Sequence, residues 1–302
     1  MKKKKKAAGL FFAPFGMCFI LFWLVPFVYG CYLSVCNMSL TRGNQGFSGL
    51  ENYIQIFSGD TVYAEAFFRG LKNILIFVVA SVPLLVIVSL ILALIVEHLP
   101  AKIKGIYRTI YFMSYAVSVT AVSAVFLWLF NGNGGYINNV LVHMGIIDAP
   151  ISWLEAQPFA WIVLVIATVW WTVGYNMMLF INGLNSIDSA LFEAVAVDGG
   201  RFFSRLRYII LPGIKHVMTY VVLMTIIASF NMYGQSALIT KGGPLNSTKS
   251  LIMEINDVIF TNNNLGEGSA MAILMGVVVM LFAMCQNWLS REKKEIKEVN
   301  GS

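Results

Sequence analysis

One short stretch of the chain carries residue types suited to recognition of another protein. It runs from Glu193 to Gly199 with the sequence EAVAVDG, and Ile209, Leu211 and Pro212 follow it at fixed distance. Small alanine side chains let a partner surface approach closely, and the Glu193 carboxylate can pair with an arginine or with a cluster of backbone amides. The alternative is an amphipathic elbow that rests on lipid headgroups.

The local sequence around this stretch predicts a helix, a turn and a second helix. Asp188 or Ser186 can cap a short helix over Ser189–Val197, which contains good helix formers. Gly199 and the glycine after it are expected to end that helix in a left-handed turn. A second helical piece should follow over Phe202–Tyr208, before a bend at Pro212.

A second group of candidates is polar but uncharged and lies within long apolar runs. Neutral hydrogen-bonding groups beside aromatic rings suit a polyhydroxy ligand such as a sugar, and the four-residue spacing of Asn231 and Gln235 predicts a shared helix face. The alternative is hydrogen bonding between helices. The candidates for a substrate pathway are Tyr175, Asn176, Asn231, Tyr233 and Gln235.

Composition shows what must position these residues. The chain of 302 residues is 58% hydrophobic and only 12% charged, about half the charge expected of a soluble domain. Six apolar runs are long enough to cross a bilayer as helices. The sequence therefore predicts an all-α membrane protein, with residues 1–302 forming one transmembrane domain. The expected spans are residues 10–35, 73–96, 106–130, 159–181, 217–239 and 269–289, with a polar loop over 183–213.

The distribution of basic residues predicts the orientation. Of the 21 Lys and Arg, 16 fall in the two tails and in the connections after the second and fourth runs. Since cytoplasmic segments carry the excess of Lys and Arg, both termini and the Glu193 loop are expected in the cytoplasm. The same reasoning assigns the net charge of +6 to topology and anionic headgroups, and not to nucleic-acid binding.

The sequence lacks the residues that are typical of several function classes. The predicted spans hold no charged residue at depth, which weakens a proton- or sodium-coupled carrier, although sodium sites can be built from carbonyls and hydroxyls alone. The three histidines are far apart, and no zinc-helix, nucleophile-elbow or phosphate-loop motif occurs. We expect no catalytic residue, metal site or cofactor in this chain, so any ATP and magnesium would be bound by another protein.

The Glu193 stretch resembles the signature loop of binding-protein-dependent ABC importer permeases, which has the spacing E-A-A-x3-G-x9-I-x-L-P. The chain is most similar to the carbohydrate branch, which includes maltose and glycerol-3-phosphate permeases. Three further segments resemble that branch: Gly49–Tyr53, Gly135–Asn138 and Gly242–Thr248. The chain departs mildly from this motif at Val195, because the third residue of the motif is usually Ala. The matching residues are Glu193, Ala194, Val195, Asp198, Gly199, Ile209, Leu211 and Pro212.

The resemblance implies a type I importer permease fold in a bacterial inner or plasma membrane. Residues Glu193 to Gly199 would form a coupling helix that docks on a cytoplasmic ATPase subunit. The implied partners are two such ATPases, a second homologous permease and an extracellular sugar-binding protein. The chain itself would be a transport subunit and not an enzyme. A permease for a polyol or glycerol phosphate, or less favourably a stand-alone secondary carrier, remains open as an alternative.

Overall fold

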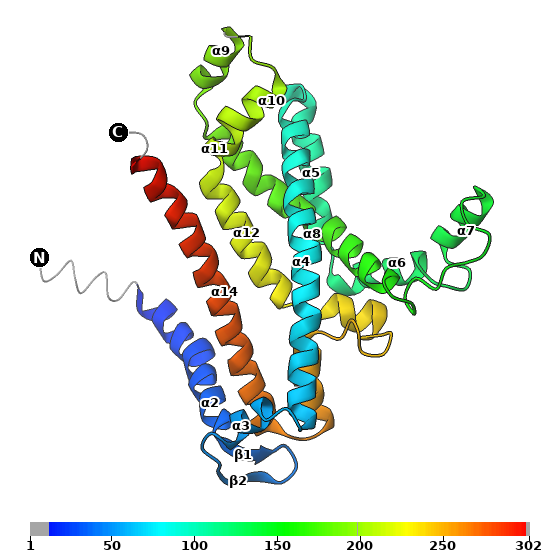
Figure 1. Cartoon of the computed structure of the whole chain (residues 1–302), viewed down its shortest axis with the longest axis vertical. Helices are drawn as coiled ribbons and strands as arrows, with labels where there is room; N and C mark the ends of the chain where they lie inside the picture. Colours follow the sequence, from blue (N-terminus) through cyan, green and yellow to red (C-terminus); the bar gives the residue numbers. More distant parts are fainter. Residues whose placement is uncertain (1–11, 198, 300–302) are drawn as a thin grey trace, which may run out of the picture. The chain divides into compact units, whose positions relative to one another are not determined.

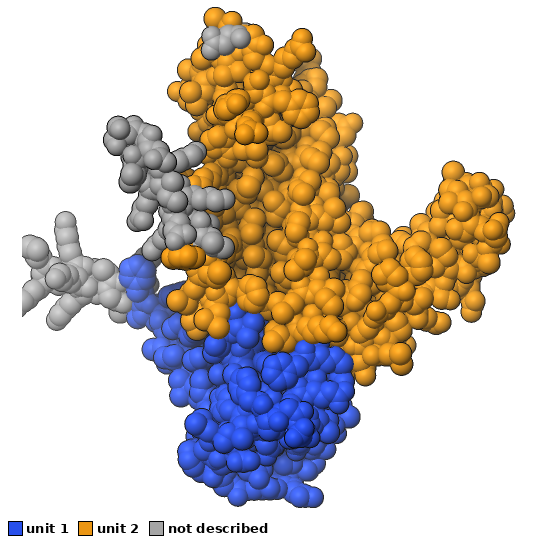
Figure 2. Space-filling view, in the orientation of Figure 1, with its two compact units in different colours: residues 1–69, 251–278 blue, residues 70–250, 279–302 orange. Residues whose placement is uncertain are grey.

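The chain folds into two compact units, each built from segments far apart in sequence. The computed structural model describes residues 12–197 and 199–299. The first unit joins Met1–Arg69 to Leu251–Val278, and the second joins Gly70–Ser250 to Val279–Ser302 (Figure 2). The expectation of a single transmembrane domain over residues 1–302 stays a prediction.

The first unit begins with an apolar helix and continues into small polar elements (Figure 1). The helix spans Phe12–Ser34. A two-stranded antiparallel sheet follows, in which Met38 pairs with Asn44 and Ser39 with Gly43. The unit contains η1 (Ile20–Leu24, π-helical), α2 (Val25–Ser34), β1 (Cys36–Ser39), β2 (Gly43–Phe47), α3 (Glu51–Phe57), the start of α4 (Val62–Glu97), α13 (Leu251–Asn256), η4 (Asp257–Thr261) and the start of α14 (Leu265–Val299).

A buried asparagine fixes the end of the first helix. The Asn52 amide donates to the carbonyls of Ser34 at 2.8 Å and Cys36 at 3.0 Å. The Tyr53 hydroxyl donates to Ser34 Oγ at 2.7 Å. The Asn52 side chain therefore satisfies backbone acceptors where the helix stops and the sheet begins, as buried carbonyls require. This is the structural role of the Gly49–Tyr53 segment.

The second unit is helical and holds both groups of candidate residues. Its core joins α4, α8 and α12 through buried side chains that include Val96, Phe180, Ile214 and Val221. Its elements are the rest of α4, α5 (Ala101–Ala116), α6 (Val119–Leu129), α7 (Tyr136–His143), α8 (Phe159–Asn185), α9 (Ser189–Val197), α10 (Phe202–Arg205), η2 (Leu206–Ile210, π-helical), α11 (Leu211–Gly213), α12 (Lys215–Phe230), η3 (Ser236–Thr240, π-helical) and the end of α14.

The count of helices that could cross a membrane reaches the predicted six only if each of two bent helix pairs forms one span. Within residues 12–197 and 199–299, four helices are long and apolar enough to cross a bilayer, and two bent pairs bring the total to six if each pair is one span. The predicted span over residues 106–130 is wrong as a continuous helix, because α5 and α6 meet at 92°. Likewise, the span over 217–239 ends early: α12 stops at Phe230, and its preceding arm lies at 70° to it.

Candidate functional site

The Glu193 stretch forms the short helix that the sequence predicts. In α9, Asp188 Oδ1 accepts a hydrogen bond from the Ala190 amide at 2.9 Å, which identifies Asp188 as the cap. At the other end, the Gly200 amide donates to the Val195 carbonyl at 2.8 Å, and Gly199 has a φ of +72°. This is the pattern of a helix ended by a left-handed glycine.

The exposure of α9 suits a surface that another molecule could reach. Glu193 and Ala194 are exposed, and Val195 is partly covered. Asp198, which the sequence also assigned to this site, lies outside the described residues. A Cβ on Gly200 would lie 2.3 Å from Val195 Cγ1, so the turn after α9 leaves no room for a side chain there.

The segment 209–213, which forms the second half of the helix–turn–helix elbow after α9, is anchored in the core. Ile209 and Ile210 are buried, and Ile210 packs with α4 and α8 residues. Leu211 and Pro212 are exposed. A Cβ on Gly213 would lie 2.8 Å from Ile187 Cδ1, in the turn between α8 and α9. The turn at Ile187 before α9 and the turn at Gly213 after α10 and η2 therefore pack together, which fixes the position of α9.

The elbow lies at the end of this unit where α4 joins α5 (Figure 1). The His98 and Phe202 rings are in edge-to-face contact, with centroids 6.4 Å apart. In the same connection, Glu97 accepts from Lys104 Nζ at 2.8 Å and also pairs with Arg108. Two of the connections that the charge pattern assigns to one side of the membrane therefore lie together.

All five substrate-pathway candidates line one cavity of about 400 Å³ in this unit. The described residues around it come from α4, α5, α6, α8, α12 and the segment after α12, and none of them is charged. The lining residues are Phe77, Leu85, Tyr115, Val119, Thr168, Trp171, Thr172, Tyr175, Asn176, Met224, Thr225, Ala228, Ser229, Asn231, Met232, Tyr233, Gly234 and Gln235.

The predicted shared helix face of Asn231 and Gln235 is wrong, although both residues line the cavity. Asn231 occupies the C-cap of α12, with φ −86° and ψ 14°, and the backbone leaves the helix there. Gln235 precedes the π-helical η3. The two residues line the same cavity with a turn of the chain between them, and they do not share a helix face.

Hydrogen bonding divides the five candidates into two kinds. The Asn176 amide donates to Thr225 Oγ1 at 3.0 Å, and the Asn231 amide donates to the Ile227 carbonyl at 2.8 Å. Gln235 is only 8% exposed, yet within the described chain its side chain has no hydrogen-bond partner. The hydroxyls of Tyr175 and Tyr233 are likewise unused there. These three residues are therefore available to a ligand.

The break between α5 and α6 and the C-terminal end of α12 both reach the cavity. Between α5 and α6 the backbone is extended at Val117, whose carbonyl accepts from Trp171 Nε1 at 2.9 Å. Val119 begins α6 and lies so close to Gly234 that a Cβ there would be 2.8 Å from Val119 Cγ2. Non-helical backbone at membrane depth is tolerated where it is buried in protein or lines a cavity. Discontinuous helices of this kind build the binding sites of many transporters.

Sequence reasoning missed several cavity residues that have identifiable signals. Tyr115 stacks on Tyr175 with ring centroids 5.0 Å apart. Trp171 lies four residues before Tyr175, on the same face of α8. Both could have been found from helix phase once α8 was assigned, whereas the break beside Tyr115 contains neither proline nor glycine.

Comparison with known proteins decides the family. Residues 54–294 match the family described as "Binding-protein-dependent transport system inner membrane component". The chain belongs to this family. It is an ABC permease, a membrane component of a transport system and not an enzyme, in agreement with the sequence prediction.

Two relatives and one solved structure illustrate the match. The permease is 29% identical to the lactose transport system permease protein LacF of Rhizobium radiobacter, over 94% of each chain. It is 28% identical to the sn-glycerol-3-phosphate transport system permease protein UgpA of Agrobacterium fabrum, over 92% of each chain. A chain of a bacterial alginate ABC transporter, crystallised with its alginate-bound periplasmic protein, shares the fold with a TM-score of 0.81 at 18% identity, covering 96% of each chain.

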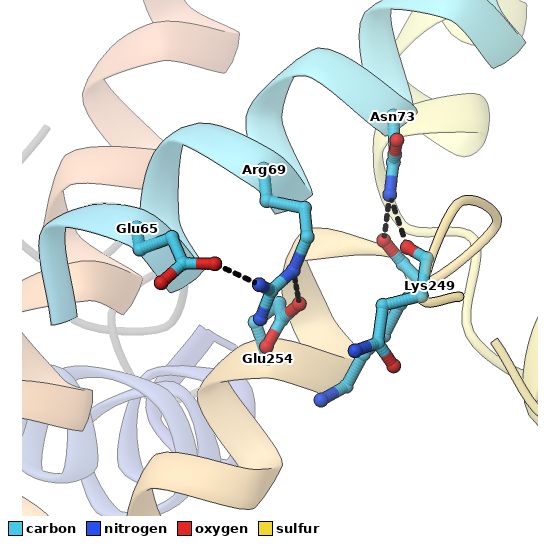
Figure 3. Close-up of polar contacts among 6 residues, drawn as sticks. Glu65, Arg69, Asn73, Lys249 and Glu254 are labelled. Atoms are coloured by element: carbon cyan, nitrogen blue, oxygen red, sulfur yellow. Dashed lines mark hydrogen bonds and ion pairs between the residues drawn. The ribbon is translucent and has the colours of Figure 1, made fainter. Parts of the chain in front are cut away.

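The other family-like segments of the permease hold its connections in shape. The Asn138 side chain donates to the Ile151 carbonyl at 2.9 Å and accepts from Trp153 Nε1 at 2.8 Å. Thr248 is fully buried, and its hydroxyl donates to the Gly243 carbonyl at 2.6 Å. Asn73 of α4 donates to the carbonyls of Asn246 at 2.8 Å and Lys249 at 3.0 Å (Figure 3). These contacts are structural, and no sequence motif points to Asn73.

Proposed function

We propose that this permease carries an uncharged sugar or oligosaccharide through the cavity around Tyr175, Tyr233 and Gln235. The observation that carries the proposal is the chemistry of this lining: aromatic rings, free hydroxyl and amide groups, and no charged side chain. Sugars present hydroxyl groups to hydrogen-bonding side chains and C–H faces to aromatic rings. A few polar groups in a mostly apolar cavity are typical of small-molecule sites.

Two features favour a neutral cargo over a phosphorylated or acidic one. A phosphate or carboxylate is usually held by arginine or lysine, and the described residues that line the cavity include neither. The relative LacF is named for lactose transport and UgpA for sn-glycerol-3-phosphate transport. The uncharged lining supports the first comparison more than the second, so a glycerol phosphate permease is the weaker alternative.

The energy source in this proposal is ATP hydrolysed by a separate cytoplasmic subunit. The exposed α9 would dock on that ATPase, with Glu193 paired to a basic group there. The buried Ile210 and the Gly213–Ile187 contact would transmit the motion of α9 to α8 and α12. Two ATPases, a second permease and an external binding protein complete the proposed assembly in the bacterial cell membrane. Such rigid coupling of elements is how bistable bundles switch.

The test uses the complete transporter, purified with its co-expressed subunits and reconstituted in vesicles. The sugar is first identified as the saccharide that stabilises the cognate binding protein against heat. Uptake of that sugar should require ATP. Glu193→Lys should insert normally, retain ATP hydrolysis and abolish uptake, because a reversed charge breaks the proposed contact. Glu155→Lys, an equal reversal at an exposed residue outside the elbow, is the matched control. Undiminished uptake by Glu193→Lys contradicts the coupling role.

A further inference from the structure

The second arm of the elbow presents large aromatic side chains that the described chain leaves uncovered. We define the elbow arm as Phe202–Gly213, which comprises α10, η2 and α11. Phe203 is 79% exposed and Tyr208 is 71% exposed. Side chains of this size contribute strongly to binding when they are covered. Their exposure next to a tightly packed core requires an explanation.

The elbow arm has two distinct faces. Leu206, Ile209 and Ile210 are covered by the rest of the unit, and Leu206 and Ile210 belong to the core of α4, α8 and α12. Phe203, Tyr208 and Leu211 are exposed. The arm therefore has two apolar faces. One is buried in protein, and the other, which carries aromatic side chains, is exposed.

The direction of the arm places it along a membrane surface. The arm Phe202–Gly213 and α12 are bent by 70° relative to each other. If α12 crosses the bilayer near its normal, the arm runs close to the membrane plane at the end of the span. Aromatic residues are enriched at this level, where an apolar ring and a polar edge are both satisfied.

The charge around the arm is of one sign. Arg201, Arg205, Arg207 and Lys215 lie on or beside it, and no Asp or Glu occurs between Gly199 and Met253. Arg201 and Arg207 are exposed. Among the side chains that the structure describes, which end at residue 288, none of the four forms an ion pair. Basic residues beside a membrane attract anionic lipid, by an amount that corresponds to about fivefold in affinity for each charge.

We propose that the exposed face of the elbow arm is an interfacial site for anionic lipid. Phe203 and Tyr208 insert at the level of the headgroups, and Arg201 and Arg207 bind lipid phosphates. The site is separate from α9, which carries the proposed ATPase contact, so it extends beyond the proposed function. It gives the elbow a fixed height relative to the bilayer while α9 remains free to engage its partner.

Lipid fits this surface better than the ATPase does. The α9 surface is made of small residues and one carboxylate, which allows a close protein contact. The arm instead alternates large aromatic rings with arginines, and its two ends are fixed by the His98–Phe202 ring contact and by the start of α12. An alternative occupant, a surface of the ATPase, is distinguished by the experiment below.

The experiment measures depth and lipid selectivity on the assembled transporter in nanodiscs. Spin labels are placed at Phe203→Cys and at Leu191→Cys on α9, after the four native cysteines are replaced by alanine. The nanodiscs contain phosphatidylcholine alone or equal parts of phosphatidylcholine and phosphatidylglycerol. We expect the label at 203 to be accessible to oxygen and shielded from a water-soluble nickel relaxant in both lipids, and the label at 191 to lack this membrane signature.

Charge removal tests the lipid chemistry. Arg201→Gln with Arg207→Gln should reduce the selectivity for spin-labelled phosphatidylglycerol by about fivefold for each charge removed. Arg42→Gln with Lys241→Gln removes two exposed charges from connections that we expect on the other side, and should leave that selectivity unchanged. The proposal is overturned if the label at 203 is open to the nickel relaxant, if it is shielded only when the ATPase is present, or if both double variants behave alike.

Discussion

Arg69 Nε donates to Glu254 Oε1 at 2.8 Å, joining residues that are 185 positions apart in sequence (Figure 3). Arg69 also pairs with Glu65, one helical turn earlier, at 2.8 Å. The two acidic partners differ in environment, because the Glu254 side chain is 3% exposed and that of Glu65 is 73% exposed. Both pairs lie within the first unit, where they join α4 to α13.

The first prediction concerns the strength of these two pairs. Arg69→Met removes a hydrogen bond to a buried carboxylate and should lower the free energy of unfolding of the first unit by about 2 kcal/mol. Glu65→Gln removes only the exposed pair and should change it by less than about 0.5 kcal/mol. Thermal unfolding can be followed by a thiol dye at the buried Cys36, with the other three cysteines replaced. Equal shifts for both variants would contradict this assignment.

The second prediction concerns the closest approach of two helices. A Cβ on Gly174 would lie 2.0 Å from the Tyr111 carbonyl oxygen, so α5 and α8 touch through backbone atoms. Gly174→Ala should therefore destabilise the second unit by about 1–3 kcal/mol, as forced overpacking does. Gly276→Ala on α14 is the control, because nothing lies within 4 Å of its Cβ position. Monodisperse yield and melting temperature measure both; a stable Gly174→Ala protein argues against the close approach.

The third prediction separates a ligand contact from a structural one. Gln235→Ala should weaken uptake of the identified sugar by up to about tenfold, since one neutral hydrogen bond contributes roughly 0.5–1.5 kcal/mol, and should leave the melting temperature unchanged. Asn176→Ala breaks the bond to Thr225 and should mainly lower stability. Initial uptake rates against sugar concentration distinguish the two. The assignment fails if Gln235→Ala transports normally at low sugar.

The fourth prediction concerns the break between α5 and α6. Trp171→Phe keeps an aromatic ring but removes the one donor that the described residues supply to the Val117 carbonyl, at a cost of about 1 kcal/mol. Because this carbonyl lies beside the cavity, we expect lower uptake as well as lower stability. Trp170→Phe is the adjacent control, since the Trp170 indole N–H has no hydrogen-bond partner in the described structure. Similar uptake and stability of the two variants would contradict a role for the hydrogen bond from the Trp171 indole.

Much of the helical framework could be predicted because long apolar runs have few alternatives in a bilayer. The elbow could also be predicted, because Asp188 prefers a helix N-cap, alanines prefer a helix, and Gly199 prefers a left-handed turn. Both features depend on short-range signals: hydropathy, capping and left-handed backbone. The same signals identified uncharged polar residues at depth, all five of which line one cavity.

The interruptions of the spans could not be predicted from such signals. The Val117–Ser118 break has no proline or glycine, and its carbonyl is satisfied by Trp171, 54 residues away. Asn231 lies in an apolar run that continues to Ile239, so hydropathy gave no reason to end α12 at Phe230. At the first break a long-range hydrogen bond stabilises backbone that leaves the helix. At Asn231 the bonds are local, from its backbone and side-chain amides to the carbonyls of Ile227 and Ala228, and hydropathy reports neither kind.

The first apolar helix is held at one end only. Asn52 and Tyr53 fix Ser34, while the apolar window of Phe12–Ser34 has none of its residues buried inside the chain. The Asn44 amide also donates to the Tyr32 hydroxyl at 3.2 Å, at this same end of the helix, so we expect the angle of the helix to follow the thickness of the surrounding hydrocarbon. Thin and thick bilayers should therefore tilt this helix differently about Ser34, through hydrophobic mismatch.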